Sequence, residues 1–215
     1  MIDASEKSEP GLRERKRRAT RRAIQHAVLD LATEHGYERV TIDEISAAAD
    51  VSPRTFFNYF ASKEEAVLGD FPSLADLAAA EDFLTEGSGA DVLSGLGRLF
   101  EAASDAIVDD RTVNQRRRVL LREHPELFAK RMSSLHLFED ELAELVRRRL
   151  AADDPMLVGE PDALARRAHL LSLVGFATMR FAYRSWIDMD DSEPLARRVR
   201  QAFEELQQTL AATVR

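Results

Sequence analysis

The 215-residue sequence contains no cysteine. This excludes disulfides, thiolate metal sites and cysteine nucleophiles, and it is typical of a protein from a reducing compartment. Long apolar runs are also missing, because the longest stretch without Asp, Glu, Lys or Arg covers only residues 168–179. A membrane-spanning helix needs about 20 apolar residues, and the polar start MIDASEKSEP lacks a signal-peptide pattern. We therefore expect a cytoplasmic protein without a membrane segment.

Signatures of enzymes and metal sites are absent as well. The sequence has no Gly-rich phosphate loop, no G-x-S-x-G and no HExxH. His136 and Glu139 lie one turn apart on a predicted helix, but two ligands are too few for a metal site. The acidic residues from Asp188 to Asp191 resemble the start of a calcium loop, but Glu193 and Val199 stand where an EF-hand needs Gly and Glu. We expect no enzyme, no metal and no cofactor.

Charge is distributed unevenly, although the formal net charge is -8. Residues 11–22 carry seven basic side chains and one acidic side chain, whereas residues 66–215 carry 19 basic and 26 acidic ones. Phosphate attraction is screened beyond about 8 to 10 Å at physiological salt, so a local basic segment can hold DNA on an otherwise acidic protein. A solvated helix face is the alternative interpretation, which the basic run alone does not exclude.

Four helices are predicted in the first third of the chain. The first has one apolar face through Ile24, Val28 and Leu31, and it ends at Gly36. The second begins at the capping box Thr41-Ile-Asp-Glu44 and runs to about Ala49. Ser52-Pro53 is typical of an N-cap followed by a first-turn proline, and it opens the third helix. A second capping box, Ser62-Lys-Glu-Glu65, opens a fourth helix of roughly residues 63–77.

Only Asp50 and Val51 separate the second helix from the third. A turn this tight needs a residue at positive φ, which Asp adopts more readily than most residues do. The pattern therefore predicts a three-helix helix-turn-helix unit in which the third helix faces DNA. Its predicted core consists of Ile24, Val28, Leu31, Ile45, Val51, Phe56 and Phe60.

The rest of the chain also has helical periodicity and no pattern typical of strands. Turn-forming residues divide it into helical segments at residues 91–109, 111–122, 125–150, 161–187 and 193–214. The last two segments are apolar enough to bury each other as a four-helix bundle in a dimer. The fold class is therefore all-α. We expect a disordered arm (1–11), a helix-turn-helix domain (12–65) and a helical ligand-binding and dimerisation domain (66–215), with a homodimer formed through residues 161–214.

The stretch VTIDEISAAADVSPRTFFNYFASKEE, residues 40–65, resembles the DNA-binding domain of the TetR (tetracycline repressor) family. The resemblance implies a dimeric repressor on a palindromic operator, and a C-terminal domain whose small-molecule ligand changes the separation of the two helix-turn-helix units. Residues 116–150 are similar to mycofactocin-system regulators, which implies an acyl-CoA-like, lipophilic effector. An activator on the same fold stays open, as does a helical protein or enzyme for lipid-like ligands that binds no operator.

The resemblance also implies which residues contact DNA. Thr41, Thr55, Tyr59 and Lys63 lie at positions where the family bonds phosphates, and Pro53, Arg54 and Asn58 lie on the face toward the bases. Arg54 is the best candidate for a bidentate contact to guanine. Phe57 replaces a common tyrosine and offers only apolar contact, such as to a thymine methyl, and Asp50 replaces the usual turn glycine. The implied basic contacts along the phosphates or the minor groove are Arg13, Arg15, Lys16, Arg17, Arg18 and Arg22.

A ligand pocket in this fold is expected among the helices from residue 91 onward. Polar candidates are Asn114, Arg118, His136 and Arg180. Apolar candidates are Phe100, Ile107, Leu121, Phe128, Met132, Leu135, Phe176, Met179 and Tyr183. Ordinary core packing is the alternative interpretation for each apolar residue, and a structural hydrogen bond or solvent exposure is the alternative for each polar one.

Overall fold

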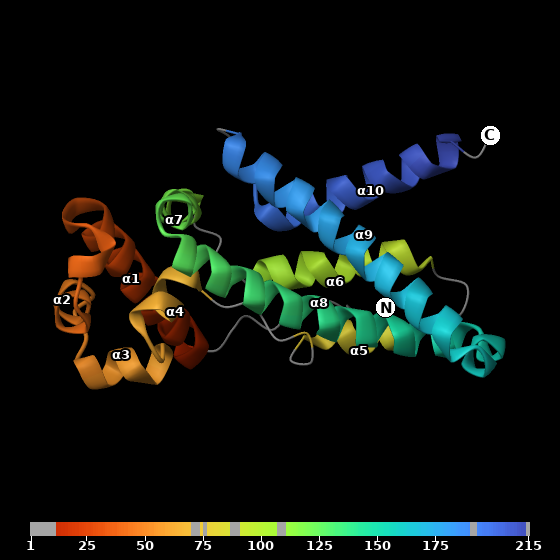
Figure 1. Cartoon of the computed structure of the whole chain (residues 1–215), viewed down its shortest axis with the longest axis horizontal. Helices are drawn as coiled ribbons and strands as arrows, with labels where there is room; N and C mark the ends of the chain where they lie inside the picture. Colours follow the sequence, from red (N-terminus) through yellow and green to blue (C-terminus); the bar gives the residue numbers. More distant parts are fainter. Residues whose placement is uncertain are drawn as a thin grey trace, which may run out of the picture. The chain divides into compact units, whose positions relative to one another are not determined.

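The computed structural model describes residues 12–69, 74, 77–86, 91–106, 111–189 and 193–213. Every regular element in these ranges is a helix, which confirms the all-α prediction. No helix within them combines the length and apolar character that a membrane crossing requires. The predicted arm, residues 1–11, lies outside the described residues. The elements are α1 (Leu12–His35), η1 (Tyr37–Arg39), α2 (Ile42–Ala48), α3 (Pro53–Tyr59), α4 (Lys63–Leu68), α5 (Ala78–Thr85), α6 (Val92–Ala106), α7 (Arg111–Glu123), α8 (Pro125–Asp153), η3 (Pro155–Gly159), α9 (Pro161–Asp188) and α10 (Leu195–Thr213) (Figure 1).

The helices group into two compact units. The N-terminal unit holds the helices from α1 to α4, as far as Gly69, together with residues 112–124 of α7 and the turn after it. The C-terminal unit holds α5, α6, α8, η3, α9 and α10. This division differs from the boundary expected between residues 65 and 66, because α7 packs with helices that lie far from it in the sequence.

Local sequence signals account for the ends of the first helices. Gly36 follows α1 with φ +84°, a left-handed conformation that glycine adopts without strain. The predicted capping box at α2 is present in full, since Thr41 and Glu44 bond each other reciprocally. At α4 the pattern is different: the Ser62 hydroxyl accepts from the Glu65 N–H at 3.2 Å, but the Glu65 carboxylate accepts from the Ala61 N–H at 2.6 Å. The second predicted capping box is therefore only half correct.

The predicted core of the N-terminal unit is largely confirmed. Ile24, Val28, Ile45, Phe56 and Phe60 are at most 1% exposed, whereas Leu31 and Val51 are half-buried. The five buried side chains come from α1, α2, α3 and the residue after α3. Their burial fixes α3 against α1 and α2.

The prediction of one fourth helix over residues 63–77 is wrong. α4 ends at Leu68, because Gly69 adopts φ +65° and breaks the helical path. A Cβ at residue 69 would lie 3.0 Å from Gln25 Nε2 and 3.2 Å from Arg117 Nη2, so the packing also favours glycine there. A separate helix, α5, then begins at Ala78.

The C-terminal unit is built from long helices that pack pairwise. α8 packs along α9, and α10 packs against both α6 and α9 (Figure 1). Four phenylalanines occupy the centre: the Phe100 ring lies 5.9 to 6.5 Å from the rings of Phe138, Phe176 and Phe203. The five segments predicted in this part of the chain correspond to α6, α7, α8, α9 and α10. Only α7 belongs to the other unit.

Candidate nucleic-acid interface

The predicted tight turn joins α2 to α3. Asp50 has φ +53°, and it is the one non-glycine residue with positive φ in the described part of the chain. The Val51 N–H donates to the carbonyl of Ser46 at 2.9 Å, which closes the turn on the end of α2. The prediction that Asp50 supplies the left-handed residue is therefore confirmed. The turn holds α3 in one orientation relative to α2.

One face of α3 is buried, and the other is open to solvent. Phe56 is fully buried, whereas Phe57 is 55% exposed and Pro53, Arg54 and Asn58 are also exposed. The rings of Phe56 and Phe57 pack edge to face with centroids 5.5 Å apart, so the exposed ring is supported from below. This face offers a planar cation, an aromatic ring and a carboxamide from a rigid helix. Such a set suits the edges of base pairs.

The two threonines with implied phosphate contacts both take part in helix caps. Thr41 donates its hydroxyl to Glu44 at 2.8 Å and accepts from the Glu44 N–H at 3.3 Å. The hydroxyls of Thr55 and Ser52 lie 2.8 Å apart in a hydrogen bond, and the Ser52 hydroxyl accepts from the Thr55 N–H at 3.0 Å. Both threonine hydroxyls are thus placed at helix N-termini, where backbone N–H groups also point outward.

The ammonium group of Lys63 lies against the end of η1. It donates to the carbonyls of Tyr37 at 2.9 Å and Val40 at 3.0 Å, and it lies 4.3 Å from the centre of the Tyr37 ring. Since an ammonium group has three donors, a phosphate contact would take the third.

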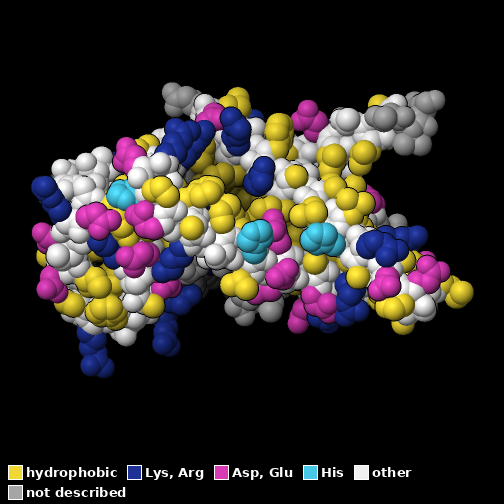
Figure 2. All heavy atoms as spheres, viewed as in Figure 1, with side chains coloured by type: hydrophobic (Ala, Val, Ile, Leu, Met, Phe, Trp, Pro, Cys, Tyr) yellow, Lys and Arg dark blue, Asp and Glu magenta, His cyan; other side chains and the backbone are white. Residues whose placement is uncertain are grey.

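The basic run lies on the first turns of α1. Arg13, Arg15, Lys16, Arg17, Arg18 and Arg22 are all exposed. Figure 2 shows Lys and Arg side chains projecting from the edge of the molecule at which α3 and the start of α1 lie in Figure 1. The described part of this run is helical, and its exposed charges are placed where they can meet a polyanion.

The sequence did not predict the residues that connect the helices of this unit through long-range contacts. The Tyr37 hydroxyl donates to Glu64 at 2.9 Å, and its ring packs edge to face on His124 at 5.0 Å. The buried Arg117 of α7 donates to the carbonyl of Val67 at 2.5 Å, at the end of α4. These contacts join residues 27 to 87 positions apart in the sequence, so no local pattern indicates them.

Comparison with known proteins identifies the family of this chain. The family model "Bacterial regulatory proteins, tetR family" matches residues 24–68, which include α2, the Asp50 turn and α3. The HTH-type transcriptional regulator TcmR of Streptomyces glaucescens is 33% identical over 152 residues, which cover 67% of this chain and 66% of that protein. The chain belongs to the TetR family. This family consists of DNA-binding transcriptional regulators and not of enzymes, as the sequence predicted.

Two further similarities extend beyond the helix-turn-helix of this TetR-family chain. A protein named as a mycofactocin biosynthesis transcriptional regulator, MftR of Mycobacterium tuberculosis (strain ATCC 25618 / H37Rv), is 27% identical over 191 residues, or 88% of this chain and 90% of that protein. This confirms the resemblance seen in the sequence. The crystal structure of a TetR regulator from Nitrosomonas europaea superposes with a TM-score of 0.52 at 19% identity, over 89% of this chain and 97% of that one. That likeness shows the fold.

The predicted ligand-binding residues of this TetR-family chain are only partly brought together. Phe100 and Phe176 are buried in the centre of the C-terminal unit, with Leu135, Met179 and Tyr183 half-buried against the same cluster. Met132 is half-buried, whereas Phe128, His136 and Arg180 are exposed, and His136 Nδ1 lies 3.2 Å from Glu139. Ile107 lies outside the described residues. Asn114, Arg118 and Leu121 belong to the N-terminal unit, where Asn114 is buried and accepts from Arg117 at 2.6 Å.

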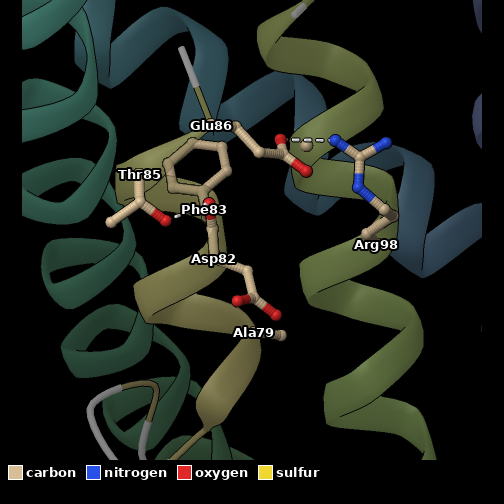
Figure 3. Close-up of a pocket in the computed structure, with 7 residues that line it drawn as sticks. Ala79, Asp82, Phe83, Thr85, Glu86 and Arg98 are labelled. Carbon is tan, nitrogen blue, oxygen red and sulfur yellow. Dashed lines mark hydrogen bonds and ion pairs between the residues drawn. The ribbon is translucent and has the colours of Figure 1, made fainter. Parts of the chain in front are cut away.

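An open cleft of about 340 Å³ lies between α5 and α6. Figure 3 shows Asp82 and Thr85 on α5, Glu86 directly after it, and Arg98 on α6, with Glu86 and Arg98 joined as an ion pair. None of the predicted ligand-binding residues lines this cleft. Ala79, Phe83 and Gly95 line it together with the polar and charged side chains, and it does not coincide with the phenylalanine-rich centre of the unit.

Proposed function

We propose that this TetR-family protein is a ligand-responsive repressor that binds a palindromic operator as a homodimer. The observation that supports this proposal best is the exposed face of α3, where Arg54, Phe57 and Asn58 project from a helix held rigidly by the Asp50 turn. Helices of this kind enter the major groove in helix-turn-helix proteins. A symmetric dimer presents two such helices to successive major grooves, roughly 34 Å apart.

The proposed contacts to DNA divide into two classes. Arg54 contacts the O6 and N7 edge of guanine, and Asn58, Pro53 and Phe57 lie beside it in the groove. Phosphate contacts hold the protein in register without selecting sequence. We assign these to Thr41, Thr55, Tyr59 and Lys63, and to the exposed basic residues Arg13, Arg15, Lys16, Arg17, Arg18 and Arg22.

The proposed dimer forms through α9 and α10. α9 carries an exposed apolar stripe at Leu170, Leu173, Ala177 and Phe181, three or four residues apart as the helical repeat requires. At the end of α10, Leu210 is 46% exposed. Exposed side chains of this size and spacing favour a helical partner surface, and two α9–α10 pairs related by a two-fold axis make a four-helix bundle.

The proposed effector is a lipophilic or acyl-CoA-like molecule that enters the C-terminal unit around Phe100, Phe176, Leu135, Met179 and Tyr183. The resemblance of residues 116–150 to mycofactocin-system regulators implies this class of ligand, and the similarity to MftR extends that resemblance over 88% of the chain. Binding would repack the surrounding helices and change the spacing of the two α3 helices, which lowers operator affinity. Because α4 has only six residues, the signal does not pass along one continuous fourth helix.

A gel-shift titration with the DNA upstream of the protein's own gene tests operator binding. Wild-type protein is expected to shift a palindromic fragment, and Arg54→Ala is expected to lose about 1 to 3 kcal/mol of binding free energy to it. Arg148→Ala removes the same charge from an exposed site on α8 and should bind as wild type does. If neither wild type nor Arg148→Ala distinguishes a palindrome from random DNA, the chain is instead a helical ligand-binding protein.

A further inference from the structure

Arg21 lies within the basic run, but its guanidinium turns toward the N-terminal unit. Nη1 donates to the carbonyl of Tyr59 at 3.0 Å, and Cζ lies 4.2 Å from the centre of the Phe60 ring. The side chain is half-buried, whereas its neighbour Arg22 is exposed. Arg21 thus contacts the end of the recognition helix α3 from α1, across 38 positions of sequence.

Tyr59 and Phe60, which Arg21 contacts, lie at the C-terminal end of α3. Tyr59 is the last residue of α3, and the last carbonyls of a helix have no N–H partner within it. Phe60 leaves the helix with an extended backbone, is 1% exposed, and packs on Phe56 with ring centroids 6.1 Å apart. A guanidinium can donate to a carbonyl in its own plane while its flat face stacks on an aromatic ring, whereas an ammonium group has no flat face and meets the same two partners with a different geometry.

We propose that Arg21 is a positioning residue for operator recognition. It holds the C-terminal end of α3 on α1, and thereby sets the angle at which Arg54 and Asn58 meet the bases. It contributes no phosphate contact, in contrast to the exposed basic residues around it. This inference rests on the proposed function, since it requires that α3 binds a specific operator.

Salt dependence separates a positioning residue from a phosphate contact. Each phosphate neutralised by a cation adds about 0.9 to the slope of log affinity against log salt concentration. Affinity is therefore measured from 50 to 300 mM KCl, on the palindromic fragment and on random DNA of equal length, for wild type, Arg21→Met and Arg22→Met. Circular dichroism melts of each variant establish that the N-terminal unit is folded.

Arg21→Met is expected to keep the wild-type salt slope and to lose roughly tenfold in operator affinity, the size of one charge-assisted hydrogen bond. The ratio of operator to random-DNA affinity falls with it, because α3 is no longer held at the correct angle. Arg22→Met, the matched control, is expected to reduce the slope by about 0.9 and to weaken binding to both DNAs alike.

A third variant, Arg21→Lys, keeps the positive charge. It tests the same proposal if Arg21→Met does not fold. The proposal predicts an unchanged slope and a lower operator-to-random ratio for it, whereas a phosphate contact would leave both unchanged. If Arg21→Met lowers the slope by about 0.9 and keeps the ratio, Arg21 binds phosphate and the proposal is wrong. If wild type itself shows no preference for the palindrome, the proposed function fails instead.

Discussion

The carboxylate of Glu44 accepts two hydrogen bonds from Thr41, from its backbone N–H at 2.9 Å and from its hydroxyl at 2.8 Å. The backbone bond, and next the hydroxyl bond, hold the pKa of Glu44 below its ordinary value of 4.5. A carboxyl group whose pKa is lowered by folding stabilises the fold above its unfolded pKa, and this contribution disappears as the pH falls through the folded pKa. The cap of α2 is therefore weakened by acid.

Replacing the charge at this cap should have a pH-dependent effect. We expect Glu44→Gln to lower the melting temperature at pH 7, and the gap to wild type should narrow once the pH falls below 4.5. Thermal melts followed by circular dichroism between pH 7 and pH 3 measure this difference in melting temperature. Asp43→Asn removes a charge from the same turn without removing a bond to Thr41, and should have a smaller effect. A gap that stays constant over this range would contradict the prediction.

The left-handed residue between α2 and α3 allows a second test. At φ +53°, alanine is disfavoured by roughly 1 to 2 kcal/mol, whereas glycine adopts this conformation freely. We therefore expect Asp50→Ala to melt below wild type and Asp50→Gly to melt at or above it. Thermal melts of the three proteins in one buffer measure the order. Equal melting temperatures for the alanine and glycine variants would show that this backbone conformation carries no strain.

The exposed ring of Phe57 predicts a contact to a thymine methyl group. Replacing single thymines of the operator with deoxyuridine removes only that methyl. One such replacement should weaken wild-type binding and leave Phe57→Ala binding unchanged. Phe57→Tyr keeps the ring and should still respond to the replacement. Fluorescence anisotropy measures the affinity of each protein for the thymine and the deoxyuridine operators. If no replacement weakens wild-type binding, Phe57 does not contact a thymine methyl group.

The dimer proposal predicts the effect of charges on α9. Leu173→Glu and Phe181→Glu place carboxylates in the exposed apolar stripe, where burial of an unpaired charge is costly. Both variants should be monomeric by light scattering after size exclusion, and both should lose cooperative binding to the palindrome. Leu137→Glu is the control, because Leu137 is 67% exposed and lies on α8, outside the proposed α9–α10 interface. If the Phe181→Glu variant remains a dimer, the dimer interface does not include this stripe of α9.

Arg149 predicts a large effect on stability in the C-terminal unit. It has no exposed surface, donates to Asp153 at 2.8 Å, and bonds the carbonyl of Phe83. Arg149→Met leaves those acceptors without a donor, and we expect a loss of roughly 2 to 4 kcal/mol of unfolding free energy. Arg98→Met removes an arginine that pairs with Glu86 at a half-exposed site and should cost less than about 1 kcal/mol. Urea titrations of wild type and both variants measure the loss of unfolding free energy at the buried and at the half-exposed arginine.

Local signals explain why so much of the N-terminal unit was predictable. The caps at Thr41 and Ser52 and the left-handed turn at Asp50 depend on residues within a few positions of one another, so the sequence alone specifies them. Gly69 offers a similar signal for the end of α4, but the apolar pattern continues beyond it and favours a longer helix. Arg21 and Tyr37 were missed because their partners are 27 or more positions away.

The ligand-binding residues could not be predicted in the same way. Helical periodicity marks an apolar face but does not say whether that face lines a cavity or fills a core. Phe100 and Phe176 fit either interpretation, and both are buried among other rings. The position of α7 could not be predicted either, since its contacts join residues far apart in the sequence, such as Arg116 and Asp30, 86 positions apart.

Because α7 completes the N-terminal unit, the DNA-binding part of this protein is discontinuous in the gene. A fragment that stops at Gly69 would leave the Val67 carbonyl without the Arg117 guanidinium that caps it. Chimaeras that exchange sensor regions between relatives therefore need residues 112–124 from the same parent as residues 1–69. A chimaera made at a single junction after α4 would pack α7 of one parent against α1 and α4 of the other parent, so the buried contacts between them would not match.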